Sequence, residues 1–257
     1  MVLLLPCISN LEKDDMRVLI ISDIHANLAA FEAVLADAKG DWDTIWCLGD
    51  LIGYGPDPNE CVALLQEHDH ISLSGNHDWA VLGKLDTDNF NREAQIAIRW
   101  TRQSISRETH DYLEKLPPKL EKAPFSLVHA SPRHPVWEYI LDAYTAAVNF
   151  DYFETPYCLV GHTHVPVVYS ELESNNVQIT PPEYDIPLQL DGTRLIINPG
   201  SVGQPRDSDP RAAYAFLDTE KLTFEHKRVE YPFEITQEKM RQYGIPTRLV
   251  RRLEYGW

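Results

Sequence analysis

The chain has 257 residues, 44% hydrophobic and 24% charged, a composition typical of globular proteins that excludes a disordered or low-complexity chain. Its 39 acidic and 23 basic residues give a net charge of −16, which disfavours non-specific binding to nucleic acids and to anionic membranes. The four cysteines form no CxxC pair, so they are interpreted as ordinary thiols in a reducing compartment.

The first residues stand apart from the rest of the chain. The apolar run Met1–Ile8 is about half the length of a signal peptide, and no basic residue precedes it. We interpret residues 1–15 as a loose extension, or as the product of a start codon upstream of Met16, and residues 16–257 as a single domain. No stretch approaches the ~18 apolar residues of a membrane span, so a cytoplasmic protein without a membrane partner is expected.

From Met16 a pattern repeats, in which a short apolar run ends abruptly at a polar residue able to bind a metal ion. Short runs of this kind are typical of buried strands. The runs are 17–22 before Asp23, 44–48 before Asp50, 70–74 before Asn76, 125–128 before His129 and 157–160 before His162.

Helical patterns lie between the first of these strands, at Leu28–Lys39 and Pro58–Glu67. Alternating strands and helices predict a mostly parallel sheet, and ligands of such sheets gather at the carboxyl ends of the strands. Five strand ends that converge on polar side chains are therefore the central feature of this sequence.

The remainder of the chain has a different character. Residues 79–124 are predicted to be a helical excursion, clearest at Asn91–Ser106. Strands at 166–169, 193–198, 212–217 and 222–230 suggest a second sheet packed on the first. The tail is predicted to close with a helix over Gln237–Tyr243, capped by Thr236 and ended by Gly244, and then a helix at about Arg248–Leu253.

Five of the ten histidines follow the strand ends: His25, His77, His129, His162 and His164. Together with Asp23, Asp50 and Asn76 they form a set of imidazole and oxygen ligands that suits Mn²⁺, Fe²⁺, Zn²⁺ or Co²⁺. Asp23 and His25 are two residues apart, so in an extended segment their side chains would leave the same face and serve one ion. Asp50 is the best placed to bridge two ions.

These residues resemble the calcineurin-like metallophosphoesterases. The resemblance rests on five motifs in order, each weak alone: Asp23-Ile-His25, Gly49-Asp50, Gly75-Asn-His-Asp78, His129 and Gly161-His-Thr-His164. A later turn, Asn198-Pro-Gly-Ser-Val-Gly203, is similar to one in the bacterial YfcE-like branch. The resemblance implies a four-layer α/β/β/α sandwich of two packed mixed sheets flanked by helices.

The resemblance also implies a dinuclear-metal-dependent phosphoester hydrolase, with manganese favoured. One ion would be held by Asp23, His25, Asp50 and His164, and the other by Asp50, Asn76, His129 and His162. A bridging hydroxide would attack phosphorus. His77 would protonate the leaving oxygen, and Asp78 would orient His77 and keep it protonated. As an alternative, Asp78 would simply cap a helix.

The segments Gly49–Gly55 and Asp78-Trp79 lack the arginines with which the protein Ser/Thr phosphatases of this superfamily clamp phosphate. A small phosphoester is therefore expected, either a phosphodiester or a nucleotide-type substrate. Candidate substrate contacts are Arg133, in a loop able to stack a base or bind phosphate, Tyr54, expected to reach the pocket, and Arg206, whose guanidinium offers a bidentate fork to phosphate. The alternatives are a solvated Arg133 and an Arg206 paired with Asp207 or Asp209.

Other interpretations are kept open. The first is a non-catalytic scaffold on the same fold, and the second is a nuclease, against which the net charge argues. A homodimer is compatible with the sequence. His68, His70, His110 and His226 are expected at the surface, as are the basic residues of the tail: Lys239, Arg241, Arg248, Arg251 and Arg252.

Overall fold

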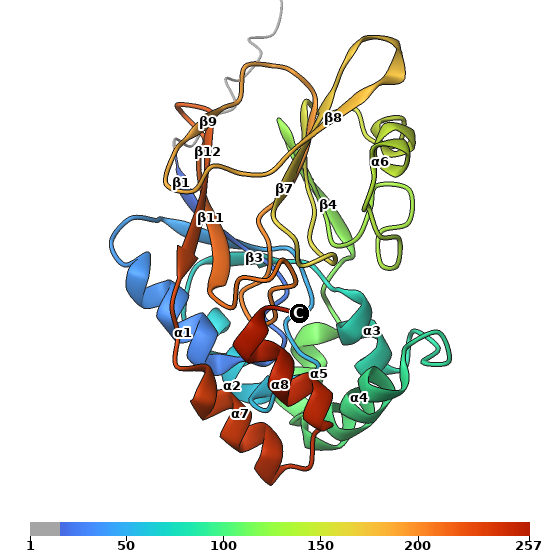
Figure 1. Cartoon of the computed structure of the whole chain (residues 1–257), viewed down its shortest axis with the longest axis vertical. Helices are drawn as coiled ribbons and strands as arrows, with labels where there is room; N and C mark the ends of the chain where they lie inside the picture. Colours follow the sequence, from blue (N-terminus) through green and yellow to red (C-terminus); the bar gives the residue numbers. More distant parts are fainter. Residues whose placement is uncertain (1–15) are drawn as a thin grey trace, which may run out of the picture.

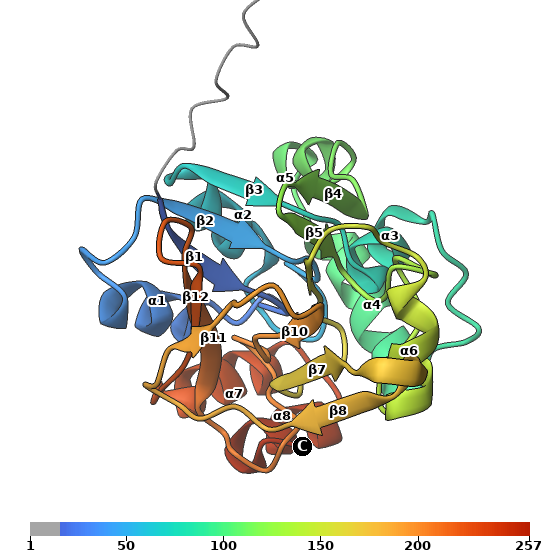
Figure 2. The same cartoon turned by 90° about the horizontal axis from the view of Figure 1, so that it is seen from above.

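The computed structural model describes residues 16–257, so the expected extension 1–15, including Cys7, lies outside the described residues. Within these residues, twelve strands form two sheets (Figures 1 and 2). The strands are β1 (Arg17–Ile21), β2 (Thr44–Cys47), β3 (His70–Ser72), β4 (Lys119–Lys122), β5 (Phe125–Val128), β6 (Tyr157–Leu159), β7 (Val167–Glu171), β8 (Val177–Thr180), β9 (Leu188–Gln189), β10 (Leu195–Asn198), β11 (Ala212–Asp218) and β12 (Thr223–Val229).

Eight α-helices are present in residues 16–257: α1 (Leu28–Asp37), α2 (Pro58–Gln66), α3 (Asn76–Leu82), α4 (Arg92–Ser104), α5 (Arg107–Leu113), α6 (Ala143–Phe150), α7 (Phe233–Gln242) and α8 (Thr247–Tyr255). Figure 1 shows α1–α5, α7 and α8 gathered below the sheets, while α6 lies apart from them, beside β8.

Both sheets are mixed. The first has the order β3-β2-β1-β11-β12-β9, and the second has the order β4-β5-β6-β10-β7-β8. In the first sheet β1, β2 and β3 run parallel, and β1 pairs antiparallel with β11. In the second sheet β5, β6 and β10 run parallel. The carboxyl ends of the five predicted ligand-bearing strands therefore meet where the two sheets adjoin.

Alternation of side chains along β1 shows how the layers pack. Val18 and Ile20 point to one face and contact Leu127 and Leu159 of the second sheet through a shared apolar cluster. Leu19 and Ile21 point to the other face, into a cluster with the helices, including Phe31 of α1. A third cluster lies between the second sheet and α6. These three apolar interfaces separate four layers, which confirms the predicted α/β/β/α sandwich.

Some elements differ from the prediction. The helical excursion 79–124 ends in a strand, β4, whose residues Lys119, Glu121 and Lys122 are exposed. Charged side chains are common in the edge strands of sheets. Because β4 contains no apolar run, the sequence pattern did not predict it as a strand. Helix α6 and strands β8 and β9 were not predicted either.

The C-terminal helices are longer than expected. The predicted cap Thr236 was wrong, because α7 begins at Phe233 and Thr236 lies inside it. There the buried Thr236 hydroxyl donates to Asn27 Oδ1 at 2.7 Å. The Thr236 hydroxyl, which the sequence pattern predicted to cap the helix, is therefore used in a tertiary hydrogen bond instead. Within residues 16–257 no helix combines the length and the apolar character needed to cross a membrane.

Candidate metal centre

Buried Asp and His side chains from four strand ends form two overlapping groups. The first comprises Asp23, His25, Asp50 and His164, and the second comprises Asp50, His129 and His162. Within each group the candidate ligand atoms lie within 4.8 Å of one another. Asp50 belongs to both groups, as a bridging ligand must.

The two oxygens of Asp50 have different surroundings. Oδ1 accepts a hydrogen bond from the backbone amide of His77 at 2.8 Å, which fixes the carboxylate. Oδ2 lies 3.6 Å from His25 Nε2 and 3.5 Å from His129 Nε2, between the two groups. Asn76 Oδ1 lies 3.2 Å from His129 Nε2, so Asn76 adjoins the second group.

The chemistry of these donors fits divalent ions. Asp23 Oδ1 and Asp50 Oδ2 are buried, and neither has a hydrogen-bond partner in the described part of the chain. An orphaned buried carboxylate oxygen is costly unless a cation satisfies it. Nitrogen and oxygen ligands without thiolate suit Mn²⁺, Fe²⁺, Co²⁺ or Zn²⁺.

The chain also orients its imidazoles toward the centre. Backbone carbonyls face the Nδ1 atoms of three rings: Leu48 O at 2.9 Å from His129, Gln204 O at 2.6 Å from His164, and Ile52 O at 3.3 Å from His25. A carbonyl only accepts, so each Nδ1 donates and each Nε2 is left to bind an ion. His162 has the opposite orientation: its Nε2 donates to Trp137 O at 3.2 Å, so its Nδ1 is the nitrogen left to bind an ion.

The segments that carry the ligands are not extended. Asp23, His25, Asp50, His162 and His164 all have positive φ, between 50° and 65°. The expectation that Asp23 and His25 leave one face of an extended segment was therefore wrong, although both side chains do enter one group. Non-glycine residues rarely adopt this conformation, and it recurs at functional sites where surrounding contacts stabilise it.

Charges within the cluster influence one another strongly. Burial alone would lower the pKa of His129, but the Asp50 and Asp23 carboxylates outweigh it and raise that pKa to about 9. Burial alone would raise the pKa of Asp23 and Asp50, but the surrounding histidines lower both. Ionised carboxylates of this kind are the form that binds a cation.

His77 lies at the edge of the cluster, but its surroundings differ from those expected. Its ring centre is 5.0 Å from that of His25 and 4.2 Å from that of Tyr54. Burial lowers the pKa of His77 to about 4 against the attraction of Asp50, so a neutral ring is favoured at neutral pH. Its Nδ1 has no hydrogen-bond partner within residues 16–257.

Asp78 does not contact His77 in the way expected. Its carboxylate accepts from the backbone amides of Gly75 at 2.9 Å, Ile52 at 3.2 Å and Leu51 at 3.4 Å. The contact with Gly75 closes a capping box at the start of α3, which is the alternative role considered above. Burial, followed by repulsion from Asp50, raises the pKa of Asp78 to about 7.

Two of the three candidate substrate contacts lie at this centre. The Tyr54 ring packs 4.8 Å from His25, and the Arg206 guanidinium lies 5.9 Å from the Tyr54 ring. Arg206 pairs with neither Asp207 nor Asp209, which instead pair with Arg228 and Arg211.

Arg133 is differently placed. It forms an ion pair with Glu138, whose carboxylate also accepts from Ser131 and Asn149. Arg133 is thus held within its own loop, and among residues 16–257 none of its hydrogen bonds or ion pairs joins it to the two metal-ligand groups.

The structure adds Gln204, which the sequence did not mark: its side chain contacts both Arg206 and Arg252. The Tyr139 ring, in the loop that also carries Arg133, lies 3.8 Å from that of His162. The expectation that His226 is a surface residue was wrong, because it is buried and lies 2.9 Å from Asn198 O.

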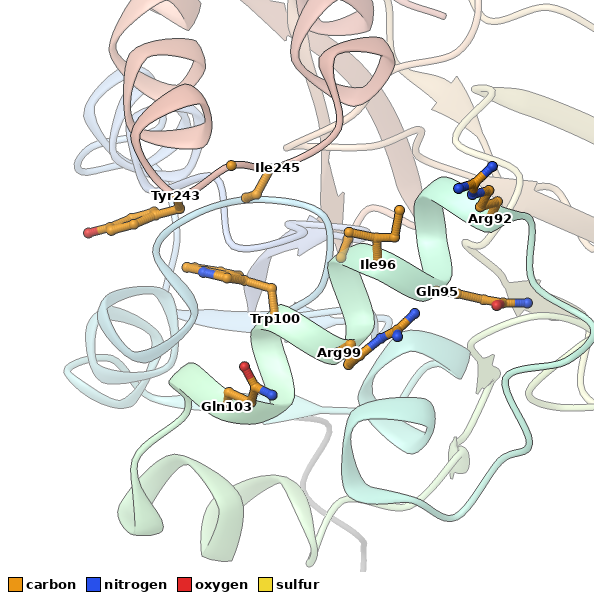
Figure 3. A pocket seen from close by; sticks show the side chains of 10 residues that line it. Arg92, Gln95, Ile96, Arg99, Trp100, Gln103, Tyr243 and Ile245 are labelled. Atoms are coloured by element: carbon orange, nitrogen blue, oxygen red, sulfur yellow. The ribbon is translucent and has the colours of Figure 1, made fainter.

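A separate surface groove of about 760 Å³ lies between α4 and the loop joining α7 to α8. In Figure 3 the rings of Trp100 and Tyr243 lie one above the other in its wall, stacked with centres 5.1 Å apart. None of the metal-ligand candidates lines this groove.

Comparison with known proteins agrees with this architecture. Residues 16–222 match the family model of the calcineurin-like phosphoesterase superfamily domain. The chain therefore belongs to that superfamily.

Several relatives resemble the chain along most of its length. An uncharacterized protein from Methanocaldococcus jannaschii is 42% identical over 245 residues, which are 92% of this chain and 97% of that one. The crystal structure of a metallophosphoesterase from Sphaerobacter thermophilus is 50% identical, has a TM-score of 0.87 and covers 95% of this chain and 100% of its own. A hypothetical protein from Pyrococcus horikoshii OT3, at 19% identity, shares the fold with a TM-score of 0.76 over 94% and 98% of the two chains.

Proposed function

We propose that this protein is a metal-dependent phosphoester hydrolase that acts on a small phosphodiester or nucleotide-type substrate. The observation that carries the proposal is the pair of ligand groups sharing Asp50, with orphaned oxygens on Asp23 and Asp50 beside His77. The narrower placement in the YfcE-like branch stays a prediction that rests on the turn Asn198–Gly203.

The residues proposed to hold two divalent ions, with manganese favoured, are Asp23, His25, Asp50, Asn76, His129, His162 and His164. Bound ions of this kind polarise a phosphoryl oxygen and lower the pKa of water so that it can attack phosphorus.

The chain's own groups would bind and orient the substrate. His77 places a neutral imidazole beside the cluster, and its N–H can donate to the leaving oxygen. Asp78 accepts from the amides of Leu51 and Ile52, which directly follow Asp50, and so positions the segment that carries the shared carboxylate. Arg206 offers a guanidinium to an anionic group of the substrate, and the Tyr54 ring packs close to both Arg206 and His25.

The test compares hydrolysis of bis(p-nitrophenyl) phosphate and p-nitrophenyl phosphate, with added Mn²⁺, by the wild type and by Asp50→Asn. We expect the wild type to hydrolyse the diester and the variant to be at least 100-fold slower, because one substitution weakens both ligand groups. Metal content per chain is measured in parallel.

The matched control is Asp88→Asn, which alters an exposed carboxylate in the loop between α3 and α4. It should retain wild-type turnover. Undiminished turnover by Asp50→Asn, or a wild type that holds two ions and hydrolyses neither ester, would contradict the proposal.

A further inference from the structure

Two arginines that are far apart in the sequence meet on one side chain next to the metal-ligand cluster. Gln204 Oε1 accepts from Arg206 Nη2 at 2.9 Å and from Arg252 Nη1 at 3.0 Å. Arg252 comes from α8, the helix that Figure 1 places at the C-terminal end of the chain. Arg252, which was expected on a helix surface, is half-buried and contacts Gln204.

Gln204 connects this pair of arginines to the cluster. Its backbone carbonyl accepts from Nδ1 of the ligand His164 at 2.6 Å, while its side chain holds both guanidinium groups. Each guanidinium carbon also lies 5.9 Å from the centre of the Tyr54 ring.

Helix α8 is fastened to the loop that carries Gln204 and Arg206. Ser208 N donates to Gly256 O at 2.9 Å, just beyond the end of α8. On the other side Leu249, Val250 and Leu253 are buried in the apolar cluster beneath the first sheet. Arg252 is therefore held in place by a packed helix, whereas its neighbour Arg251 is exposed.

The charges of the two guanidinium groups are not neutralised. Neither Arg206 nor Arg252 forms an ion pair in the part of the chain that the structure describes, although the protein has 39 acidic residues. The Nε atoms of both are buried and have no hydrogen-bond partner there. Both residues are only half-buried overall, so an anion can reach them from solvent.

Two cations brought together by a neutral amide repel each other, and burial strengthens that repulsion. The amide oxygen of Gln204 orients the groups without supplying a negative charge. An anion with several acceptor oxygens would satisfy the free N–H groups and the charge together, and phosphate matches the planar fork of arginine. The arrangement is thus complementary to a phosphate group.

We propose that Arg206 and Arg252, oriented by Gln204, bind a second phosphate group of the substrate, distinct from the one that is hydrolysed. This inference rests on the proposed function, in which the Asp–His cluster and His77 take the scissile phosphate. It narrows the substrate to compounds with two phosphate groups, linked either through a sugar or through an anhydride.

The test uses three substrates that share thymidine and a p-nitrophenyl leaving group. They are thymidine 5′-(p-nitrophenyl phosphate), the same compound with a 3′-phosphate, and the β-(p-nitrophenyl) ester of thymidine 5′-diphosphate. The Mn²⁺-loaded wild type, Arg252→Gln, Arg252→Lys and the control Arg251→Gln are compared, with thermal unfolding measured for each.

We expect one of the two-phosphate compounds to have about tenfold higher kcat/KM in the wild type, mainly through a lower KM. Arg252→Gln should abolish that preference and leave the one-phosphate substrate within about twofold. Arg252→Lys should restore part of the preference, and Arg251→Gln should keep all of it. The preferred compound tells whether the second phosphate is carried on a sugar or in an anhydride.

Equal activity on all three compounds in the wild type would overturn the inference. A loss in Arg252→Gln that affects the one-phosphate substrate equally would overturn it too, because it would indicate a structural role. If the metal-loaded wild type hydrolyses none of the compounds, the proposed hydrolase function fails. The affinities of the three intact compounds are then measured by calorimetry, which tests the phosphate site by itself. The two-phosphate compound should bind about tenfold more tightly to the wild type, and Arg252→Gln should abolish that difference.

Discussion

At the scale of single residues, the cluster depends on close approach of the backbone to functional side chains. Gly53 has a φ of +96°, and a Cβ added there would lie 2.7 Å from His77 Nδ1. No side chain larger than hydrogen fits between this turn and the imidazole. Gly53 thus determines where His77 sits beside the metal ligands.

We expect Gly53→Ala to reduce kcat on bis(p-nitrophenyl) phosphate at least tenfold while two metal ions remain bound. The added methyl group must displace the His77 ring, which is not one of the proposed ligands. Turnover and metal content are measured on the same Mn²⁺-loaded sample.

Gly192→Ala is a matched control for this change. Gly192 also has a φ of +96°, but a Cβ there meets nothing within 4 Å. Both substitutions should cost about 1–2 kcal/mol of stability through backbone strain, and only Gly53→Ala should slow turnover. Equal kcat values for the two variants would show that the position of His77 does not matter for the reaction.

At the scale of elements, the two sheets are joined by a buried polar contact as well as by their apolar faces. His226 of β12 lies 2.9 Å from the carbonyl oxygen of Asn198 at the end of β10. Burial lowers the pKa of His226 to about 4, partly offset by that hydrogen bond. The ring is therefore neutral in the folded protein over a pH range in which an unfolded chain protonates it.

This contact predicts a specific dependence of stability on pH. Above pH 6.5 His226 is neutral in both states and adds no pH dependence. As the pH falls from about 6.5 to about 4, the unfolded chain binds a proton that the folded chain does not, so the free energy of unfolding decreases. The decrease due to this residue should be about 3 kcal/mol, at about 1.4 kcal/mol per pH unit.

The measurement is urea unfolding between pH 7.5 and 4, in the presence of EDTA, for the wild type and His226→Gln. Glutamine can still donate to the carbonyl but does not titrate, so the variant should lose about 3 kcal/mol less than the wild type over this range. Parallel stability curves for the two proteins would rule out this role for His226.

At the scale of the whole molecule, bound ions are expected to stabilise the fold because their ligands come from both sheets. Asp23 and Asp50 follow strands of the first sheet, and His129 and His162 follow strands of the second. An ion that binds only the folded protein adds about 2.7 kcal/mol when its free concentration is 100 times its Kd.

Removal of metal with EDTA should therefore lower the Tm of the wild type by roughly 10 °C or more if two ions leave. Readdition of Mn²⁺ should restore it. The Asp50→Asn variant should show a much smaller difference between the two conditions in the same calorimetric scan. A wild-type Tm that stays constant while the ions are lost would mean that they do not link the sheets.

The sequence by itself determined the class of fold and the order of the ligand-bearing strands. Each apolar run was short and ended at a polar side chain, and both signals are local. The parallel arrangement of those strands then required Asp23, Asp50 and Asn76 to lie at one edge of their sheet. The order and spacing of the motifs were also sufficient to predict these polar residues as metal ligands and not as ordinary polar residues of the core.

Tertiary structure alone decided the features that depend on contacts between distant residues. Helix packing brings Arg252 to Gln204, 48 positions away, and a hydrogen bond makes His226 a buried link between the sheets. The carbonyls that select which imidazole nitrogen faces the cluster come from loops that no motif describes. From sequence alone, a charged or polar side chain is expected to be exposed. Whether it is in fact buried, and with which group it forms a hydrogen bond, is decided only when the elements pack together.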